Sequence, residues 1–171
     1  MTPSPDTTNA SAPPAGPALR QGLGRFATGV TIITCASADG QRTGLTANSF
    51  ASLSLDPPLI LWSLRLASPS LAAFMAAPAF AVNVLAQSQL ELSRRFASAL
   101  PDKFAQGAWQ EGLDGVPLLS GCAAVIECLR ETHQPAGDHM LFIGRVRRMT
   151  DQAVAPLVFQ SGHYRMLGEI L

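Results

Sequence analysis

Short apolar runs separated by turn residues dominate the chain and predict a protein built mostly from β-strands. The predicted strands cover residues 30–35, 43–50, 59–64, 80–85, 122–132, 139–149 and 156–160. Turn signals at Asp39-Gly40 and at Pro135-Ala-Gly-Asp138 separate neighbouring strands. Asp56-Pro57-Pro58 is expected to stop the second strand, because proline cannot donate to a sheet ladder. The simplest closed arrangement is a small antiparallel barrel with helices over its openings.

Short helices are predicted between the strands, over residues 19–27, 70–77 and 89–97. The second would have Ser68 at its N-cap and Pro69 at its first helical position, a common helix start. Ser88, with Glu91 three residues later, fits a capping box for the third. Residues 102–115 are expected to form a loop or a broken helix. The predicted fold class is therefore mainly β with inserted helices.

The first seventeen residues differ in composition from the rest of the chain. They are rich in Pro, Ser, Thr and Ala and have almost nothing to bury. We expect residues 1–18 to be a disordered tail and residues 19–171 to form a single domain, because neither an internal repeat nor a second linker divides them.

Composition and charge exclude several classes of protein. Apolar residues make up 47% of the 171 residues, which is enough to fill a core and excludes global disorder. Twelve basic and 12 acidic residues give a net charge of zero, which argues against nucleic-acid binding and against a polybasic membrane contact. No apolar run reaches the length of about 18 residues that suggests a spanning helix, and the N-terminus lacks the pattern of a secretory signal. We therefore expect a cytoplasmic protein.

The three cysteines, Cys35, Cys122 and Cys128, are too few and odd in number for a disulfide framework. Cys122 and Cys128 lie on one predicted strand and hence on one face, where packed core thiols are commoner than metal ligands. His133 and His163 have no partner at a motif spacing and are expected to be ordinary core or surface residues. We expect no metal site. Motifs of Rossmann folds, P-loops, zinc proteases and serine hydrolases do not occur.

Three polar features stand out among the strands and turns. Thr43–Phe50 carries hydroxyl and amide groups where a strand is predicted, which fits an exposed sheet face or a wall that hydrogen-bonds a ligand. Ser68-Pro69-Ser70, just after Arg65, fits a capped helix or a phosphate site at a helix start. Gly137-Asp138-His139 places a histidine at the start of a strand, either as an ordinary turn residue or as a group that carries charge near neutral pH. Taken singly, each feature favours its structural explanation.

Five ordered motifs, which include the first and third of these features, resemble the flavin reductase-like family, the small NAD(P)H:flavin oxidoreductases of two-component flavin monooxygenases. The motifs are FATGVTIIT at 26–34, GLTANSFASLS at 44–54, FAVNVL at 80–85, GDH at 137–139 and FIGRV at 142–146. The resemblance extends from about residue 19 to residue 167 and leaves only the tail outside. Five motifs in the same order are far more specific than any one of them, so the resemblance outweighs the structural explanations.

The resemblance implies an FMN-binding split β-barrel, usually a homodimer with the flavin near the subunit interface. It also implies that NADH or NADPH reduces FMN or FAD by hydride transfer from nicotinamide C4 to flavin N5, and that the reduced flavin leaves for a partner oxygenase. Two other functions stay open. One is a flavin- or haem-binding module without turnover, and the other is an oxidase or oxygenase that keeps its FMN tightly bound.

Site residues follow from the same resemblance. Those expected to hold the flavin are Thr46, Ala47, Asn48, Ser49, Ser63, Leu64, Ser68, Ser70, Asn83, Val84, Leu85 and Phe96. Ser68 and Ser70 would take the phosphate, with Arg65 nearby. His139 is the expected catalytic residue, because it would position the nicotinamide and help to stabilise charge. Tyr164 and Arg25 are expected to border the pyridine nucleotide.

Overall fold

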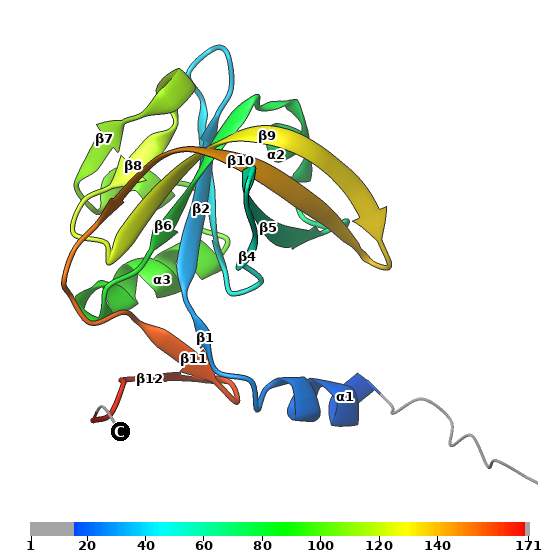
Figure 1. Cartoon of the computed structure of the whole chain (residues 1–171), viewed down its shortest axis with the longest axis vertical. Helices are drawn as coiled ribbons and strands as arrows, with labels where there is room; N and C mark the ends of the chain where they lie inside the picture. The colour runs from blue at the N-terminus through cyan, green and yellow to red at the C-terminus, as the bar shows by residue number, and fades with distance from the viewer. Residues whose placement is uncertain (1–15, 170–171) are drawn as a thin grey trace, which may run out of the picture.

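The computed structural model describes residues 16–169 and has a curved antiparallel sheet at its centre (Figure 1). Seven strands lie in the order β3-β2-β6-β9-β10-β5-β4. Their bounds are β2 Thr31–Ala36, β3 Arg42–Ala47, β4 Ala51–Leu55, β5 Pro58–Arg65, β6 Ala79–Val84, β9 Ala124–Ala136 and β10 His139–Asp151. The mainly β class predicted from the apolar pattern is confirmed. Complete closure of the sheet into a barrel stays a prediction.

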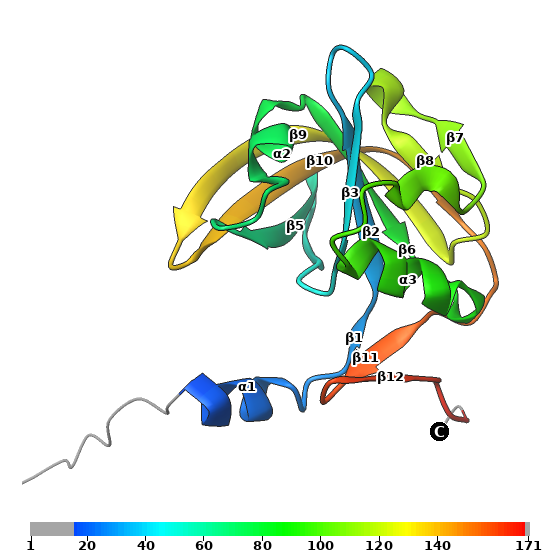
Figure 2. The same cartoon turned by 180° about the vertical axis from the view of Figure 1, so that it is seen from behind.

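Short helices and two small sheets complete the fold (Figure 2). The helices are α1 Gly16–Leu23, α2 Leu71–Ala76 and α3 Leu90–Ala97, with 3-10 turns at Gln87–Gln89, Lys103–Ala105 and Leu113–Gly115. β1 Thr28–Gly29, β11 Val158–Gln160 and β12 His163–Arg165 form one small sheet, and β7 Trp109–Glu111 pairs with β8 Pro117–Leu119 in the other. No helix among residues 16–169 is both long and apolar enough to cross a membrane.

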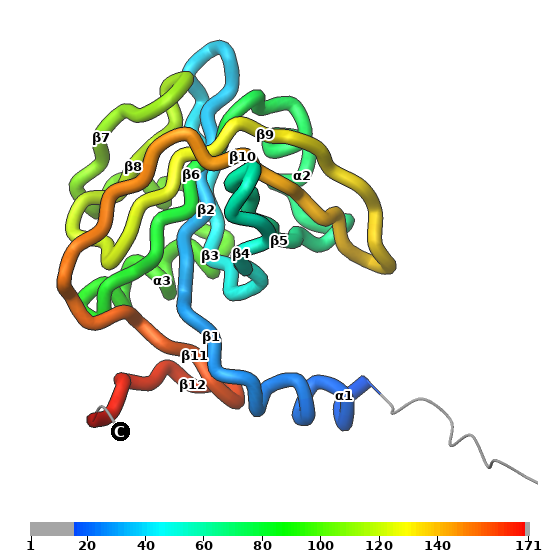
Figure 3. The backbone as a smooth tube through the Cα atoms, in the orientation of Figure 1, coloured from blue at the N-terminus to red at the C-terminus, as the bar shows by residue number. Residues whose placement is uncertain are grey.

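β1, near the start of the described chain, lies beside β11 and β12, near its end, and these strands form with α1 an arm below the body (Figure 3). β1 pairs antiparallel with β11, so that Thr28 is opposite Phe159. Helix α1 buries none of its residues, and Leu23 and Phe26 are 67% and 78% exposed. The arm therefore carries apolar surface that the described part of the chain leaves uncovered.

Strand β2 pairs with β3 and β6 along its two edges and is buried on both faces, because a core cluster packs on each side of the sheet there. Ile33 packs into the core cluster on one face and Ile32 into the cluster on the other, as the alternation of a strand requires. The polar residues of this strand find partners inside the protein; Thr34 Oγ1, for example, donates to the carbonyl oxygen of Pro117 at 2.6 Å. The strand that looks half polar in sequence is thus an interior strand with satisfied hydroxyls.

An aromatic cluster fills the core beside β5 and β10. Trp62 stacks on Phe142 with ring centroids 4.6 Å apart, and Phe74 and Phe80 meet the Trp62 ring edge-on at 4.9 and 5.8 Å. All four rings are buried. Since close-packed rings move little, this cluster gives the two strands a rigid backing.

All three cysteines are buried and unpaired with one another. Burial raises the pKa of each thiol to about 12, so the expectation of packed core thiols is confirmed. The expectation that Cys122 and Cys128 share one face of a strand is wrong. Cys122 precedes β9 and packs in a different cluster from Cys128.

The helices form where expected, but their ends differ from the predictions. Residues 1–15, most of the expected disordered tail, lie outside the described residues, while 16–18 belong to α1, which ends at Leu23 rather than at Ala27. Helix α2 has Ser70, not Ser68, at its N-cap. The predicted Ser88 capping box does not form; a 3-10 turn precedes α3 there, and Gln89 Oε1 accepts the Ala86 N–H at 3.0 Å.

Strand β4 was not predicted. The sequence suggested one strand from Thr43 to Phe50, ended by the Asp56-Pro57-Pro58 stop, whereas β4 follows as a separate edge strand at Ala51–Leu55. Pro58 is the first residue of β5, a position that proline tolerates in a strand. The proline pair therefore marks a reversal between two strands instead of the end of the sheet.

Candidate active site

A groove of about 850 Å³ opens between the ends of β3 and β5, the segment before α2 and the C-terminal end of α3. Two other hollows, of about 370 and 260 Å³, are smaller. The larger volume lies in the range typical of small-molecule sites, about 300–1,000 Å³. The groove brings together ten of the predicted site residues, namely Thr46, Ala47, Asn48, Ser49, Ser63, Leu64, Ser68, Ser70, Phe96 and His139.

The end of β3 is tied to β5 by a serine pair. Ser49 Oγ donates to the carbonyl oxygen of Ser63 at 2.9 Å and accepts the Ser63 N–H at 3.0 Å. Residues 48–50 link β3 to β4, the two edge strands of the sheet. The Ser49 hydroxyl is therefore engaged within the protein, where the sequence had suggested a bond to ligand.

Helix α3 forms one wall of the groove because it packs against β3. Thr46 Oγ1 donates to the carbonyl oxygen of Ser93 at 2.7 Å, so this hydroxyl also serves the fold. Phe96 is 1% exposed and meets Phe104 edge-on at 5.1 Å. Gly44 leaves room for this ring, since a Cβ there would lie 2.7 Å from Phe96 Cε1. Phe96 thus belongs mainly to the core under the groove.

Free polar groups remain along the edge of the groove. Within residues 16–169, strand β3 pairs with β2 only, so its other edge offers backbone N–H and carbonyl groups that the sheet does not use. Asn48, at the end of this strand, is exposed, and no described residue hydrogen-bonds to its side-chain amide. Ser68 Oγ accepts the Ser70 N–H at 3.3 Å and keeps its own proton to donate.

His139 lies at the rim of the groove, at the first position of β10. Gly137, at φ +60°, and Asp138 make the two-residue turn between β9 and β10, and His139 is paired with Arg65 of β5. Its Nδ1–H donates to Asp138 Oδ1 at 2.7 Å, because an ionised carboxylate can only accept. This hydrogen bond, with the charge of His139, lowers the pKa of the Asp138 carboxyl below its usual value. The Nε2 atom of His139 is left for a ligand.

Two basic side chains line the groove, and one of them had no site role in the sequence-based prediction. Arg65 stood near the predicted phosphate site, but Lys103 was only noted as the sole lysine. Lys103 Nζ donates to the carbonyl oxygen of Phe96 at 3.0 Å, and Arg95 Nε holds the Lys103 carbonyl oxygen at 2.8 Å. Partial burial lowers the pKa of the Lys103 ammonium. The two cations make the groove suitable for an anionic group.

Three predicted flavin contacts do not line the groove. Asn83 is fully buried; its Nδ2 donates to the Ile32 carbonyl oxygen at 3.0 Å and its Oδ1 accepts the Leu119 N–H at 2.8 Å. Leu85 is also fully buried, and Val84 packs against a core cluster. We therefore leave Asn83, Val84 and Leu85 out of the proposed site, because Asn83 and Leu85 are fully buried and the half-buried Val84 packs against the core, outside the groove lining.

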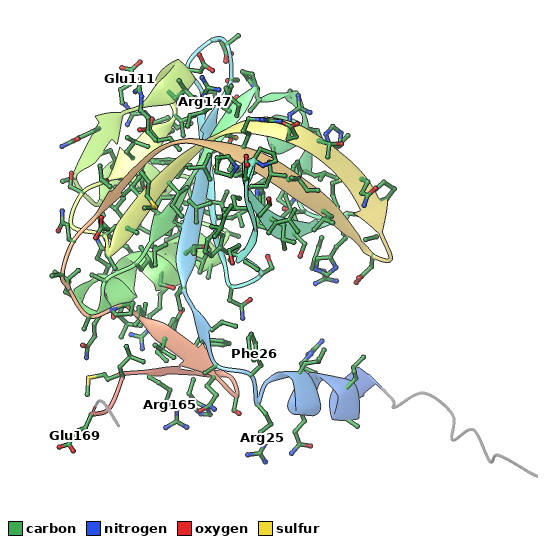
Figure 4. All side chains as sticks on the ribbon, in the orientation of Figure 1. Arg25, Phe26, Glu111, Arg147, Arg165 and Glu169 are labelled. Atoms are coloured by element: carbon green, nitrogen blue, oxygen red, sulfur yellow. The ribbon has the colours of Figure 1, made fainter. Side chains whose placement is uncertain are left out.

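The two residues expected to border the pyridine nucleotide lie on the arm, outside the groove. Tyr164 OH is 2.9 Å from Ser93 Oγ, and its ring meets Phe159 edge-on at 5.4 Å. Arg25 is exposed and points away from the body, whereas Phe26 points toward it (Figure 4). Neither Tyr164 nor Arg25 lines the groove of its own chain.

Comparison with known proteins adds an independent finding. The family model described as "Flavin reductase like domain" matches residues 23–168. The chain is 44% identical over 147 residues to the reductase subunit of a flavin-dependent monooxygenase from Rhodococcus jostii, covering 85% of this chain and 75% of that one. It is 41% identical over 146 residues to the reductase component of the flavin-dependent trigonelline monooxygenase of Acinetobacter baylyi, covering 85% of this chain and 47% of that one.

A solved structure has the same fold. The NADH:FAD oxidoreductase of Streptomyces globisporus superposes with a TM-score of 0.86 at 34% identity, over 96% of this chain and 100% of that chain. The chain nevertheless spans about half the length of the first curated relatives that it matches, 47% in two cases. The chain therefore shares its fold with that oxidoreductase over almost its whole length, while some other relatives are about twice as long as the matched region.

Proposed function

This chain belongs to the family of flavin reductase-like domains, and we propose that it transfers hydride from a reduced nicotinamide nucleotide to FMN or FAD. The observation that carries the proposal is the groove itself, which joins an unpaired strand edge, two cations and a histidine at one opening. NADH is the favoured donor, because a relative of this fold is named as an NADH:FAD oxidoreductase.

The residues of the groove suit a flavin. An isoalloxazine ring carries carbonyl and imide groups, which the free backbone edge of β3 and the amide of Asn48 complement. Hydroxyl groups at Ser68 and Ser70 and the ammonium of Lys103 suit the phosphate. These groups come from separate elements that the sheet and α3 hold in place, so the groove does not need a ligand to assemble it.

The cofactors supply the chemistry, a hydride transfer from nicotinamide C4 to flavin N5. The protein orients the two ligands. The β3 edge would hold one ring by its polar rim, and His139, whose Nδ1 is bonded to Asp138, would offer Nε2 to the second ligand at the opening of the groove.

A spectrophotometric assay tests this function. Purified protein mixed with NADH and FMN or FAD is expected to consume the NADH absorbance band in a flavin-dependent manner. Flavin binding without NADH consumption would instead indicate a binding module. Turnover that needs no added flavin would indicate an enzyme that retains FMN. Absence of any flavin binding in a titration would remove the proposal altogether.

Ser68→Ala combined with Ser70→Ala is expected to raise the Kd for FMN about a hundredfold, since each hydrogen bond to a charged group contributes roughly 1.5–3 kcal/mol. The effect rests on the hydroxyl groups, because α2 begins only at Leu71 and is six residues long. Riboflavin, which lacks the phosphate, should lose less affinity. Fluorescence titration measures both ligands, and Ser52→Ala, on the exposed edge strand β4, serves as the control. Equal losses for FMN and riboflavin would argue against the phosphate role.

We also propose that two chains associate through the arm and that an oxygenase component consumes the reduced flavin. The dimer is supported by Leu23 and Phe26, two apolar side chains of the arm that the described part of the chain leaves exposed. Arg25 and Tyr164 stay in the proposed nucleotide site only through such a second copy. Sedimentation should show a particle of twice the chain mass, and Leu23→Asp with Phe26→Asp should halve it. A wild-type monomer would exclude the dimer.

A further inference from the structure

Asp138 shares the tip of the β9–β10 hairpin with His139, and its side chain is directed at the imidazole. The Asp138 Oδ1 to His139 Nδ1 distance is 2.7 Å. The two side chains differ in environment, because that of Asp138 is 81% exposed and that of His139 is 38% exposed and lines the groove. The imidazole therefore lines the groove, whereas the carboxylate that bonds to it is more exposed and is not part of the groove lining.

The backbone around this pair is held in place. The Asp138 carbonyl oxygen accepts the Leu66 N–H at 2.9 Å, which fixes the hairpin tip to the end of β5. His139 is paired with Arg65 on one side and with Ala136 on the other. With both neighbouring strands attached, the remaining freedom of His139 is the rotation of its side chain and the choice of tautomer. The hydrogen bond to Asp138 is the interaction that restricts both.

We infer that Asp138 is a positioning residue that acts through His139. By accepting the Nδ1–H it selects the tautomer whose Nε2 is unprotonated in the neutral ring, and it holds that nitrogen toward the groove. It also compensates the charge of the imidazolium form. This inference rests on the proposed function for its kinetic consequence, but the tautomer and the ring orientation do not depend on catalysis.

The simpler explanation of an exposed carboxylate–histidine pair on a turn is a surface ion pair that has no functional role. Exposed ion pairs contribute about 0–1 kcal/mol to stability, so that explanation predicts no change in kinetics or in tautomer when Asp138 is removed. Arg65 is the other charged group that acts on the Asp138 carboxylate, after the larger effect of His139. The experiment must therefore separate an effect through His139 from an effect on Arg65 or on the turn.

A double-mutant cycle makes this separation. Asp138→Ala is expected to raise the KM for NADH about tenfold with the flavin Kd and the melting temperature unchanged. In a protein that already carries His139→Ala, Asp138→Ala should not raise the KM for NADH further, because the imidazole through which Asp138 acts is absent. Asp138→Asn, whose side-chain oxygen still accepts the Nδ1–H, should restore part of the loss. Additive losses in the double variant would overturn the inference.

The chain offers a matched control and a readout that needs no turnover. Asp39 is likewise an exposed hairpin-turn aspartate that accepts a local hydrogen bond, from Ser37, but it lies outside the groove, so Asp39→Ala should leave the KM unchanged. Nitrogen-15 NMR resolves the imidazoles, since the sequence has three histidines. His139 should show the Nδ1–H tautomer in the wild type and a mixture in Asp138→Ala. An unchanged tautomer would defeat the inference even if the flavin reductase activity is confirmed, and a shifted one would support it even if that activity is absent.

Discussion

His139→Ala is expected to lower kcat/KM for NADH about tenfold to a hundredfold while leaving the flavin Kd within about twofold of the wild type. The imidazole is the group at the groove rim with a ring nitrogen still open to a ligand, since its other nitrogen is held by Asp138. Loss of a hydrogen bond to a charged or reacting group costs about 1.5–3 kcal/mol, which corresponds to this range. The flavin should be retained, because the β3 edge and Asn48 do not depend on His139.

Steady-state kinetics at varied NADH concentration, with flavin titration in parallel, measure the effect. His163→Ala is the matched control, because that histidine is exposed on the arm and its imidazole bonds only the Ser161 carbonyl oxygen among the described residues. Its kinetic constants should equal those of the wild type. If His139→Ala leaves both kcat and KM unchanged, the histidine has no part in nucleotide use. Asp138 would then have no effect on the KM for NADH through His139.

Gly144→Ala is expected to lower the free energy of unfolding by about 2–3 kcal/mol, within the usual cost of overpacking a core. A Cβ at this position would collide with the tip of the Phe80 ring and lie 2.9 Å from Cys128 Cβ. Phe80 cannot yield easily, because its ring packs edge-on against the buried Trp62. The strand that carries His139 would have to shift away from β9, so catalysis should fall as well.

Urea denaturation measures this loss, and a melting temperature lower by about 5–10 °C should accompany it. Gly29→Ala provides the control, because a Cβ there meets nothing within 4 Å and the backbone is not in the left-handed region. That variant should stay within about 0.5 kcal/mol of the wild type. A Gly144→Ala protein of wild-type stability would show that the sheet accommodates the methyl group by a small movement, and that Gly144 is not required for packing.

Asn83 shows why part of the site could not be predicted from the sequence. A polar residue in an apolar strand indicates a buried group that needs a partner, but the partner can be a ligand or another segment of the chain. Here the partners are backbone groups of Ile32 and Leu119, which are far away in sequence. Lys103 is the reverse case, a residue that lines the groove although the sequence-based prediction did not include it. Its loop has no periodicity, so nothing in the sequence indicated that it would turn toward the groove.

Strand β4 was missed for a related reason. Its alternation is weak, because an edge strand here exposes Leu53 and Leu55 instead of burying them, and the following prolines looked like an end. The strands β2, β5, β6 and β10 were predicted correctly, since each has a β-branched or apolar run bounded by turn residues. Gly144 lies in a family motif, but the sequence does not show why glycine is needed there, because the ring that a Cβ would meet belongs to Phe80 on another strand.

Local patterning by itself determined the mainly β class, most strand positions, the hairpin turns and the family, because these depend on residues that are neighbours along the chain. The tertiary structure alone decided how far the fold uses each polar side chain: Asn83 is buried and bonded within the protein, Ser49 and Thr46 line the groove with their hydroxyls bonded to backbone groups, and Asn48 lines it with no described partner. The physical reason is that a hydrogen-bond partner is set by distance in space, and the partners of these side chains come from strands and helices that the sequence does not place beside them.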